Sequence, residues 1–136
     1  MAIIGFNFNK VMVERKSMVK GNININNNIS IKDIDKMDIT FAKDDQQGLK
    51  FSFEFVSKYD PDIGEIRILG EVIVLEPKKK AEDIAKQWKK DKKIDAAVMN
   101  PIFQAALEKC HIEALILSRD VNLPPSLPLR LKPKEN

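Results

Sequence analysis

The sequence predicts an α+β fold in which a run of antiparallel strands is followed by two helices and an extended tail. Two patterns carry this prediction. Apolar residues alternate with a period of two in the first half of the chain, and in the second half they recur with the period of a helix. The 136 residues provide for one domain, 1–136, with a strand region of about 3–76, a helical region of about 79–122 and an extended apolar tail over 123–136.

The strand region contains successive runs of alternating apolar and polar residues separated by turn residues, so neighbouring strands are expected to pair antiparallel. The first run changes phase by one residue at Asn9-Lys10, which indicates a β-bulge or a strand that swaps its buried face. The second run is broken by three asparagines at 26–28. The cleanest alternation is that of residues 49–55, and Pro77 ends the region.

Two segments with helical periodicity follow. In the first, four apolar residues lie at i, i+3, i+4 and i+7 and share one face: Ala81, Ile84, Ala85 and Trp88. In the second, Asn100-Pro101 makes a good N-cap and first-turn pair, although a helix could already run from Asp95. Pro124-Pro125 ends this helix, and we expect the leucine-rich tail to lie extended along an apolar surface.

The long second helix is apolar around most of its circumference and leaves only a narrow polar stripe. A helix of this kind must be buried on most sides, so we expect the sheet to cover one side and a second subunit to cover the other. The predicted residues of the oligomer interface are Phe103, Leu107, Cys110, Ala114 and Leu117.

No group of residues predicts catalysis. The single histidine, His111, lies on the polar stripe, where a solvent-facing or locally bonded ring is expected, and Cys110 is expected to be a buried, inert thiol. The glycines form no phosphate-binding loop, and the carboxylates of residues 60–65 fit a hairpin turn better than a calcium loop. We therefore expect no enzymatic activity, no cofactor and no metal.

The composition is that of a globular protein, with 43% hydrophobic and 32% charged residues. No signal peptide or membrane span is expected, and one cysteine fits a reducing compartment, so a cytoplasmic location is predicted. The formal net charge is only +3. The lysine runs between Lys78 and Lys93 fit the solvated face of a helix, and nucleic-acid binding is the less favoured interpretation.

Parts of the second half resemble the SecB-like chaperones. The stretch YDPDIGEIRILGEVIVLEP looks like the final hairpin strand of that family, and NPIFQAALEKCHIEALILSRDVNLPPSLPL looks like its long helix and apolar, proline-bearing segment. Five residues occupy the roles that SecB gives to an Asn, an aromatic residue, an alanine-rich middle and a late Arg: Asn100, Phe103, Ala105, Ala106 and Arg119. The resemblance, to the small archaeal and prophage-type members above all, covers about half the chain, from Tyr59 to Leu131.

The resemblance implies a four-stranded antiparallel sheet with helices on one face, dimers that pair into tetramers, and binding of unfolded polypeptide clients in apolar grooves. SecB is acidic and this chain is slightly basic, so general holding of clients, or guarding one partner such as a toxin's antitoxin, is expected over hand-over to the export motor. The client-groove candidates, any of which could instead complete the core or a subunit interface, are Ile34, Met37, Ile39, Phe41, Trp88, Leu123, Leu127 and Leu129.

Overall fold

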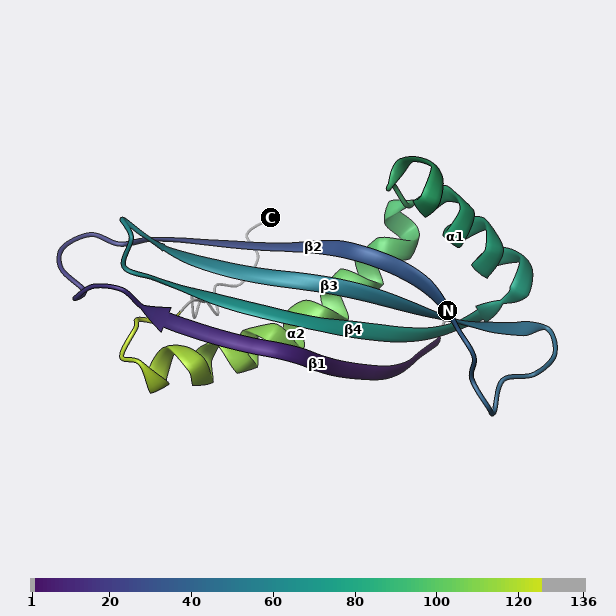
Figure 1. Ribbon diagram of the computed structural model, residues 1–136, viewed down its shortest axis with the longest axis horizontal. Coiled ribbons are helices and arrows are strands. Elements are labelled where there is room, and N and C mark those ends of the chain that lie inside the picture. The colour runs from purple at the N-terminus through teal and green to yellow at the C-terminus, as the bar shows by residue number, and fades with distance from the viewer. Residues whose placement is uncertain (1, 126–136) are drawn as a thin grey trace, which may run out of the picture.

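The computed structural model describes residues 2–125, which form four strands followed by two helices (Figure 1). The strands are β1 (Ala2–Arg15), β2 (Asn24–Met37), β3 (Gln46–Asp60) and β4 (Gly64–Pro77), and the helices are α1 (Lys78–Asp91) and α2 (Ala96–Asp120). All three strand pairings are antiparallel, in the order β1-β4-β3-β2. The predicted α+β class and the four-stranded antiparallel sheet are confirmed.

Both helices lie on one face of the sheet. Helix α2 crosses behind the strands on a diagonal, from near β2 to beyond β1, and α1 lies at the opposite end from the C-terminal end of α2 (Figure 1). Contacts of α2 reach β4, β3 and β1, and those of α1 reach β2, β3 and β4. This arrangement leaves the other face of the sheet without a helix in the described part of the chain.

The core forms where the alternating residues of β3 and β4 meet the helices. Leu49, Phe51, Phe53 and Phe55 are all at most 1% exposed. Phe53 lies opposite Gly70 in the register of β3 and β4, and a Cβ atom at that glycine would come within 2.6 Å of the phenyl ring. The absence of a side chain there makes room for the ring.

The sequence indicated irregularities in the first two strands, and the structure confirms the one in β1 but not the one in β2. The register of β1 against β4 shifts between Phe8 and Lys10, so the bulge predicted from the phase change is confirmed. The asparagines at 26–28 do not interrupt β2, because each of them has a register partner on β3. A bulge in β2, between Ile31 and Asp33, changes the phase of that strand and turns Ile34 into the core opposite Phe51.

Helix α1 buries the four residues that the periodicity placed on one face. Its Trp88 packs into the core and donates its indole N–H to Asp33 of β2, at 3.3 Å. Helix α2 begins at Ala96 with Asp95 as the N-cap residue, so the start predicted at Asn100-Pro101 is wrong and the earlier start is confirmed.

The buried stripe of α2 repeats every four residues, through Ile102, Ala106, Cys110, Ala114 and Ser118. Four residues turn an α-helix by about 400°, so each step moves the buried stripe about 40° around the axis. The contact face therefore winds around α2, as a helix that crosses a sheet diagonally requires.

The end of α2 is fixed against the hairpin that joins β3 and β4. Asn122 adopts a left-handed conformation, and the backbone N–H of Leu123 bonds to the carbonyl of Ser118 at 2.8 Å, as in a Schellman cap. Leu123 is buried, and the Tyr59 hydroxyl donates to the Pro124 carbonyl at 2.6 Å. Leu127 and Leu129 lie outside the described residues. No helix among residues 2–125 is long and apolar enough to cross a membrane.

Candidate functional site

Most of the large apolar side chains that the described chain leaves exposed gather on β1, the loop after β1, and α2. The nine exposed residues are Ile3, Ile4, Phe8, Val11, Met18, Val19, Phe41, Ile112 and Ile116. Phe41 alone lies elsewhere, in the loop between β2 and β3. We call the members on β1 and α2 (Ile3, Ile4, Phe8, Val11, Ile112 and Ile116) the β1–α2 surface.

Strand β1 is only partly covered because it is an edge strand at the margin of the helix layer. Phe6 packs on Phe53 of the core with ring centroids 5.6 Å apart, and the ring of Phe8 stands edge-on to Phe6 at 5.1 Å. The ammonium group of Lys109 on α2 lies 5.7 Å from the Phe6 ring centroid. Helix α2 therefore reaches Phe6 and leaves Phe8 and Val11 open to solvent.

The outer edge of β1 also lacks a strand partner in the described chain, since β4 is its one neighbour in the sheet. Such an edge presents backbone N–H and C=O groups that can pair with another extended chain. The outward side of α2 presents Ile112 and Ile116, which are 62% and 41% exposed. The β1–α2 surface thus combines apolar side chains with unpaired backbone groups.

A shallow, open pocket lies at the C-terminal end of α2, and we call it the α2-end pocket. It measures about 550 Å³. Its lining combines the loop after β1, the last turns of α2 and the segment that follows, in the residues Val19, Leu115, Ser118, Arg119, Asn122, Leu123, Pro124 and Pro125. Met18, which precedes Val19, is 68% exposed. A pocket with apolar walls and a few polar groups is the shape that binds side chains of a ligand.

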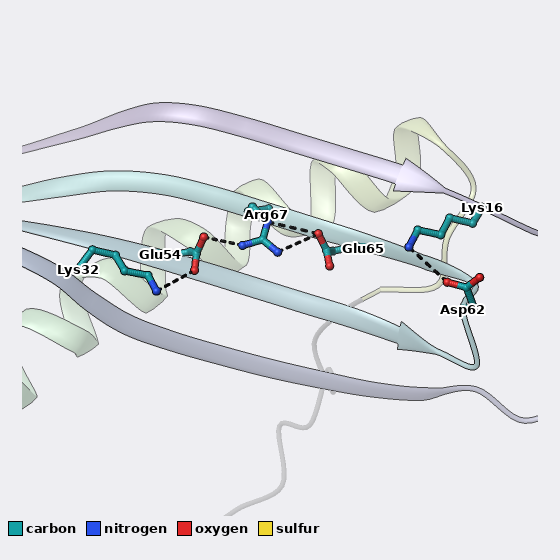
Figure 2. A network of polar contacts seen from close by, with 6 residues as sticks. All are labelled: Lys16, Lys32, Glu54, Asp62, Glu65 and Arg67. Carbon is teal, nitrogen blue, oxygen red and sulfur yellow. Dashed lines mark hydrogen bonds and ion pairs between the residues drawn. The ribbon is translucent and has the colours of Figure 1, made fainter.

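The helix-free face of the sheet carries a network of paired charges (Figure 2). Arg67 bridges Glu54 at 2.5 Å and Glu65 at 3.2 Å, and Lys32 approaches the other oxygen of Glu54 at 3.3 Å. Burial acts to raise the pKa of Glu54, but hydrogen bonds from Arg67 and Lys32 outweigh burial and hold this pKa below its usual range. A carboxylate held ionised by two cations is a poor proton donor, so this network fits a structural role.

Two residues of α2 have chemically versatile side chains: Cys110 faces the core, and His111 lies at its margin. Burial raises the pKa of the Cys110 thiol to about 12, so the thiol is protonated at neutral pH and has no exposed surface. The ring of His111 is half-buried and stands edge-on to Phe55 at 6.1 Å, and burial lowers its pKa. Among residues 2–125, no group of three or more His, Cys, Asp or Glu side chains could hold a metal ion.

No protein-family model and no curated protein matches the chain. Among solved structures, the chain is similar to the Mycobacterium tuberculosis SecB-like chaperone Rv1957 in complex with a ChAD peptide from the Rv1956 HigA1 antitoxin. The TM-score is 0.56 at 11% sequence identity, and the alignment covers 98% of this chain and 91% of the other. The chain has the SecB-like fold. At this identity the likeness shows the fold alone, and at that level it confirms the resemblance found in the sequence.

The predicted groove residues do not come together in this fold. Ile34, Trp88 and Leu123 are at most 7% exposed and belong to the core, so they have no surface to offer a client, and the expectation for them is corrected. Met37 and Ile39 are half-buried near the exposed Phe41, at the end of the sheet where α1 begins.

The predicted interface residues of α2 also fall into a buried group and a half-buried group. Cys110 and Ala114 are 0% exposed and pack on the sheet, so for these two the expectation is corrected. Phe103, Leu107 and Leu117 are half-buried along the flanks of the helix and stay candidates.

Sequence reasoning missed Ile112 and Ile116, although the signal was present. The buried residues of α2 recur at four-residue spacing from Ile102, and helical geometry places Ile112 about 120° from Ala106 and about 160° from Cys110. Taking that stripe as the sheet-facing side would have assigned both isoleucines to the outward side. The exposure of β1 had no such signal, because its alternation resembles that of the buried β3.

Proposed function

We propose that this protein is a SecB-like holdase chaperone, which binds unfolded or non-native polypeptide through apolar surface, performs no catalysis and acts as a homo-oligomer, a dimer or a tetramer. The observation that carries the proposal is the set of large apolar side chains that the 124 described residues leave exposed, most of them on β1, the loop after it and α2. Contiguous exposed apolar surface on a globular chain marks a place where another polypeptide binds. We place the protein in the cytoplasm, in keeping with its single, buried cysteine.

The β1–α2 surface and the α2-end pocket differ in shape, and this difference suggests which of them contacts other subunits and which contacts clients. The β1–α2 surface consists of a strand edge and a helix side, which suit the repeated, self-complementary contacts between identical subunits. The α2-end pocket is a shallow and mostly apolar hollow, which suits side chains of an extended client. We therefore assign subunit contacts to the β1–α2 surface and client contacts to the pocket.

The proposal is tested by slowing the aggregation of denatured test proteins at stoichiometric amounts. The exposed pair Met18 and Val19 beside the pocket is replaced by serine in one variant, and the exposed Phe41 at the far end of the sheet is replaced by serine in another. We expect the M18S/V19S variant to lose much of the protection and F41S to keep it. Loss in F41S alone would move the client site to the loop between β2 and β3, and no protection by the unaltered protein across several clients would refute the holdase.

A second candidate function is that of a dedicated interaction protein with one partner, such as an antitoxin. The observation that favours it is the structural neighbour, whose bound ligand is a peptide from an antitoxin. Co-purification of one stable protein, together with no effect on the aggregation of unrelated clients, would select this function over a general holdase.

A further inference from the structure

Helix α1 and the short segment after it hold the positive charge of the chain. Between Lys78 and Asp95 there are eight lysines and four carboxylates, a formal charge of +4, whereas the whole chain carries +3. The rest of the chain is therefore close to neutral. All eight lysines are exposed. A charge this localised, at one end of an elongated sheet (Figure 1), creates a directed field that a dispersed surface charge does not.

Helical geometry gathers three of these lysines on one side of α1. Successive residues are about 100° apart, so Lys79, Lys86 and Lys90 project within a sector of about 40° on the side opposite the buried face of Ala81 and Trp88. Together with Lys93, which follows the end of the helix, we call these residues the α1 lysine face.

The lysine face forms no close ion pair within the described chain. Lys80 pairs with the buried Glu76 at 3.3 Å, and the ammonium group of Lys92 lies 5.1 Å from the Trp88 ring centroid. No residue of the α1 lysine face forms an ion pair with another residue in the range 2–125. These four ammonium groups are therefore available to an external anion.

The chemistry of α1 favours a polypeptide partner over a nucleic acid. The segment has lysines but no arginine, so it lacks the planar groups that pair with phosphate and bases in two-point contacts. The one tryptophan of the chain is 7% exposed and its N–H is bonded to Asp33, so it cannot stack on a base. Glu82 and Asp83 lie between the two ends of the lysine face and would repel a phosphate backbone with its closely spaced charges.

Glu82 and Asp83 also determine how far apart the acidic groups of a matching ligand must be. They divide the lysines of α1 into an N-terminal group around Lys79 and a C-terminal group around Lys90. The rise of an α-helix puts these two residues about 16 Å apart, a distance that about five residues of an extended chain span. We propose that the α1 lysine face binds acidic polypeptide segments in which two groups of carboxylates are separated by about five residues.

This surface goes beyond the proposed holdase function, because α1 lies at the opposite end of the fold from the α2-end pocket (Figure 1). Its partner is recognised by charge, and the partner of the pocket by apolar contact. The two proposals can therefore fail separately.

The test measures fluorescence anisotropy of a labelled peptide that has two triple-glutamate groups joined by about five Gly/Ser residues, a spacing taken from strand geometry. A peptide with glutamine in place of glutamate and a single-stranded DNA of the same length serve as comparison probes. We expect the glutamate peptide to bind at about 50 mM salt, at least tenfold more tightly than either comparison probe, and to dissociate at about 500 mM salt, where exposed charges are screened.

A charge-reversed variant locates the binding site. Lys86→Glu with Lys90→Glu should weaken peptide binding at least tenfold, whereas Lys10→Glu with Lys20→Glu, an equal charge change at exposed positions on β1 and the loop after it, should leave binding within about twofold. Circular dichroism confirms that both variants fold. Equal loss in both variants, no binding to the unaltered protein, or tighter binding of DNA than of peptide would each overturn the proposal.

Discussion

Replacing Ile112 and Ile116 together with serine should abolish self-association without unfolding the subunit. The two side chains are 62% and 41% exposed, so together they leave about one whole isoleucine side chain in water. Covering that much apolar surface contributes about 2 kcal/mol. A two-fold symmetric dimer covers both copies. The substitution therefore removes about 4 kcal/mol from the dimer, which raises its dissociation constant roughly a thousandfold.

The assay is sedimentation velocity across a range of protein concentrations. We expect the unaltered protein to move from dimer or larger to monomer only at high dilution, and the variant to stay a monomer at concentrations where the unaltered protein is associated. Gln104→Ser with Glu108→Ser is the matched control, because both residues are exposed on the same side of α2 and only polar side chains are replaced.

Serine lowers helix propensity in both variants, so both should lose a similar, small amount of stability. Apart from this shared cost, we expect the free energy of unfolding to change by no more than about 0.5 kcal/mol in either variant. Superimposable mass–concentration curves for the unaltered protein and the isoleucine variant would show that another surface holds the subunits together. A strict monomer at all concentrations would remove the basis for assigning subunits to the β1–α2 surface.

Three further predictions concern the stability of the subunit. Gly70→Ala should lower the free energy of unfolding by about 2 kcal/mol or more, because the new Cβ atom would lie 2.5 Å from a carbonyl oxygen of β1. At Gly21 a Cβ atom would meet nothing within 4 Å, so Gly21→Ala should cost only the backbone strain of its left-handed conformation, about 1 kcal/mol, in the same thermal melt. Tyr59→Phe should cost about 1 kcal/mol in urea unfolding through the lost bond to Pro124, and faster amide exchange at Leu123 would accompany it. Cys110 should resist a thiol reagent at pH 8 until the protein unfolds. Burial raises the pKa of this thiol from 9.0 to about 12, so the thiol is protonated in both the folded and the unfolded state below pH 9. Above pH 9 the unfolded state loses the proton first, so the free energy of unfolding should fall as the pH rises, and it should fall less in Cys110→Ala. Equal losses in the two proteins would contradict this assignment.

Much of the secondary structure follows from local patterns. The buried face of α1, the apolar alternation of β3 and the bulge of β1 were all readable from residue spacing, because a helix of period 3.6 and a strand of period two present fixed sides. The sequence left the start of α2 open between two positions, because Asn100-Pro101 fits a helix start locally, while the turn from Ala96 is stabilised by the burial of Met99.

The candidate site depended on contacts that no local pattern contains. Ile34 was expected at the surface, but one extra residue in β2 turns it toward Phe51. Phe8 on β1 and Phe53 on β3 alternate alike in sequence, and only their positions in the strand order separate an exposed edge from a buried centre.

The sequence by itself determined that this chain has strands followed by helices, which side of most of these elements is apolar, and that no residue constellation predicts catalysis. Tertiary structure alone decided which apolar sides stay open. The physical reason is that periodicity is a property of neighbouring residues, whereas the burial of an apolar side depends on the strand order and on the diagonal path of α2. That arrangement leaves Val11 and Ile112 in water and buries Cys110 and Ala114 against the sheet.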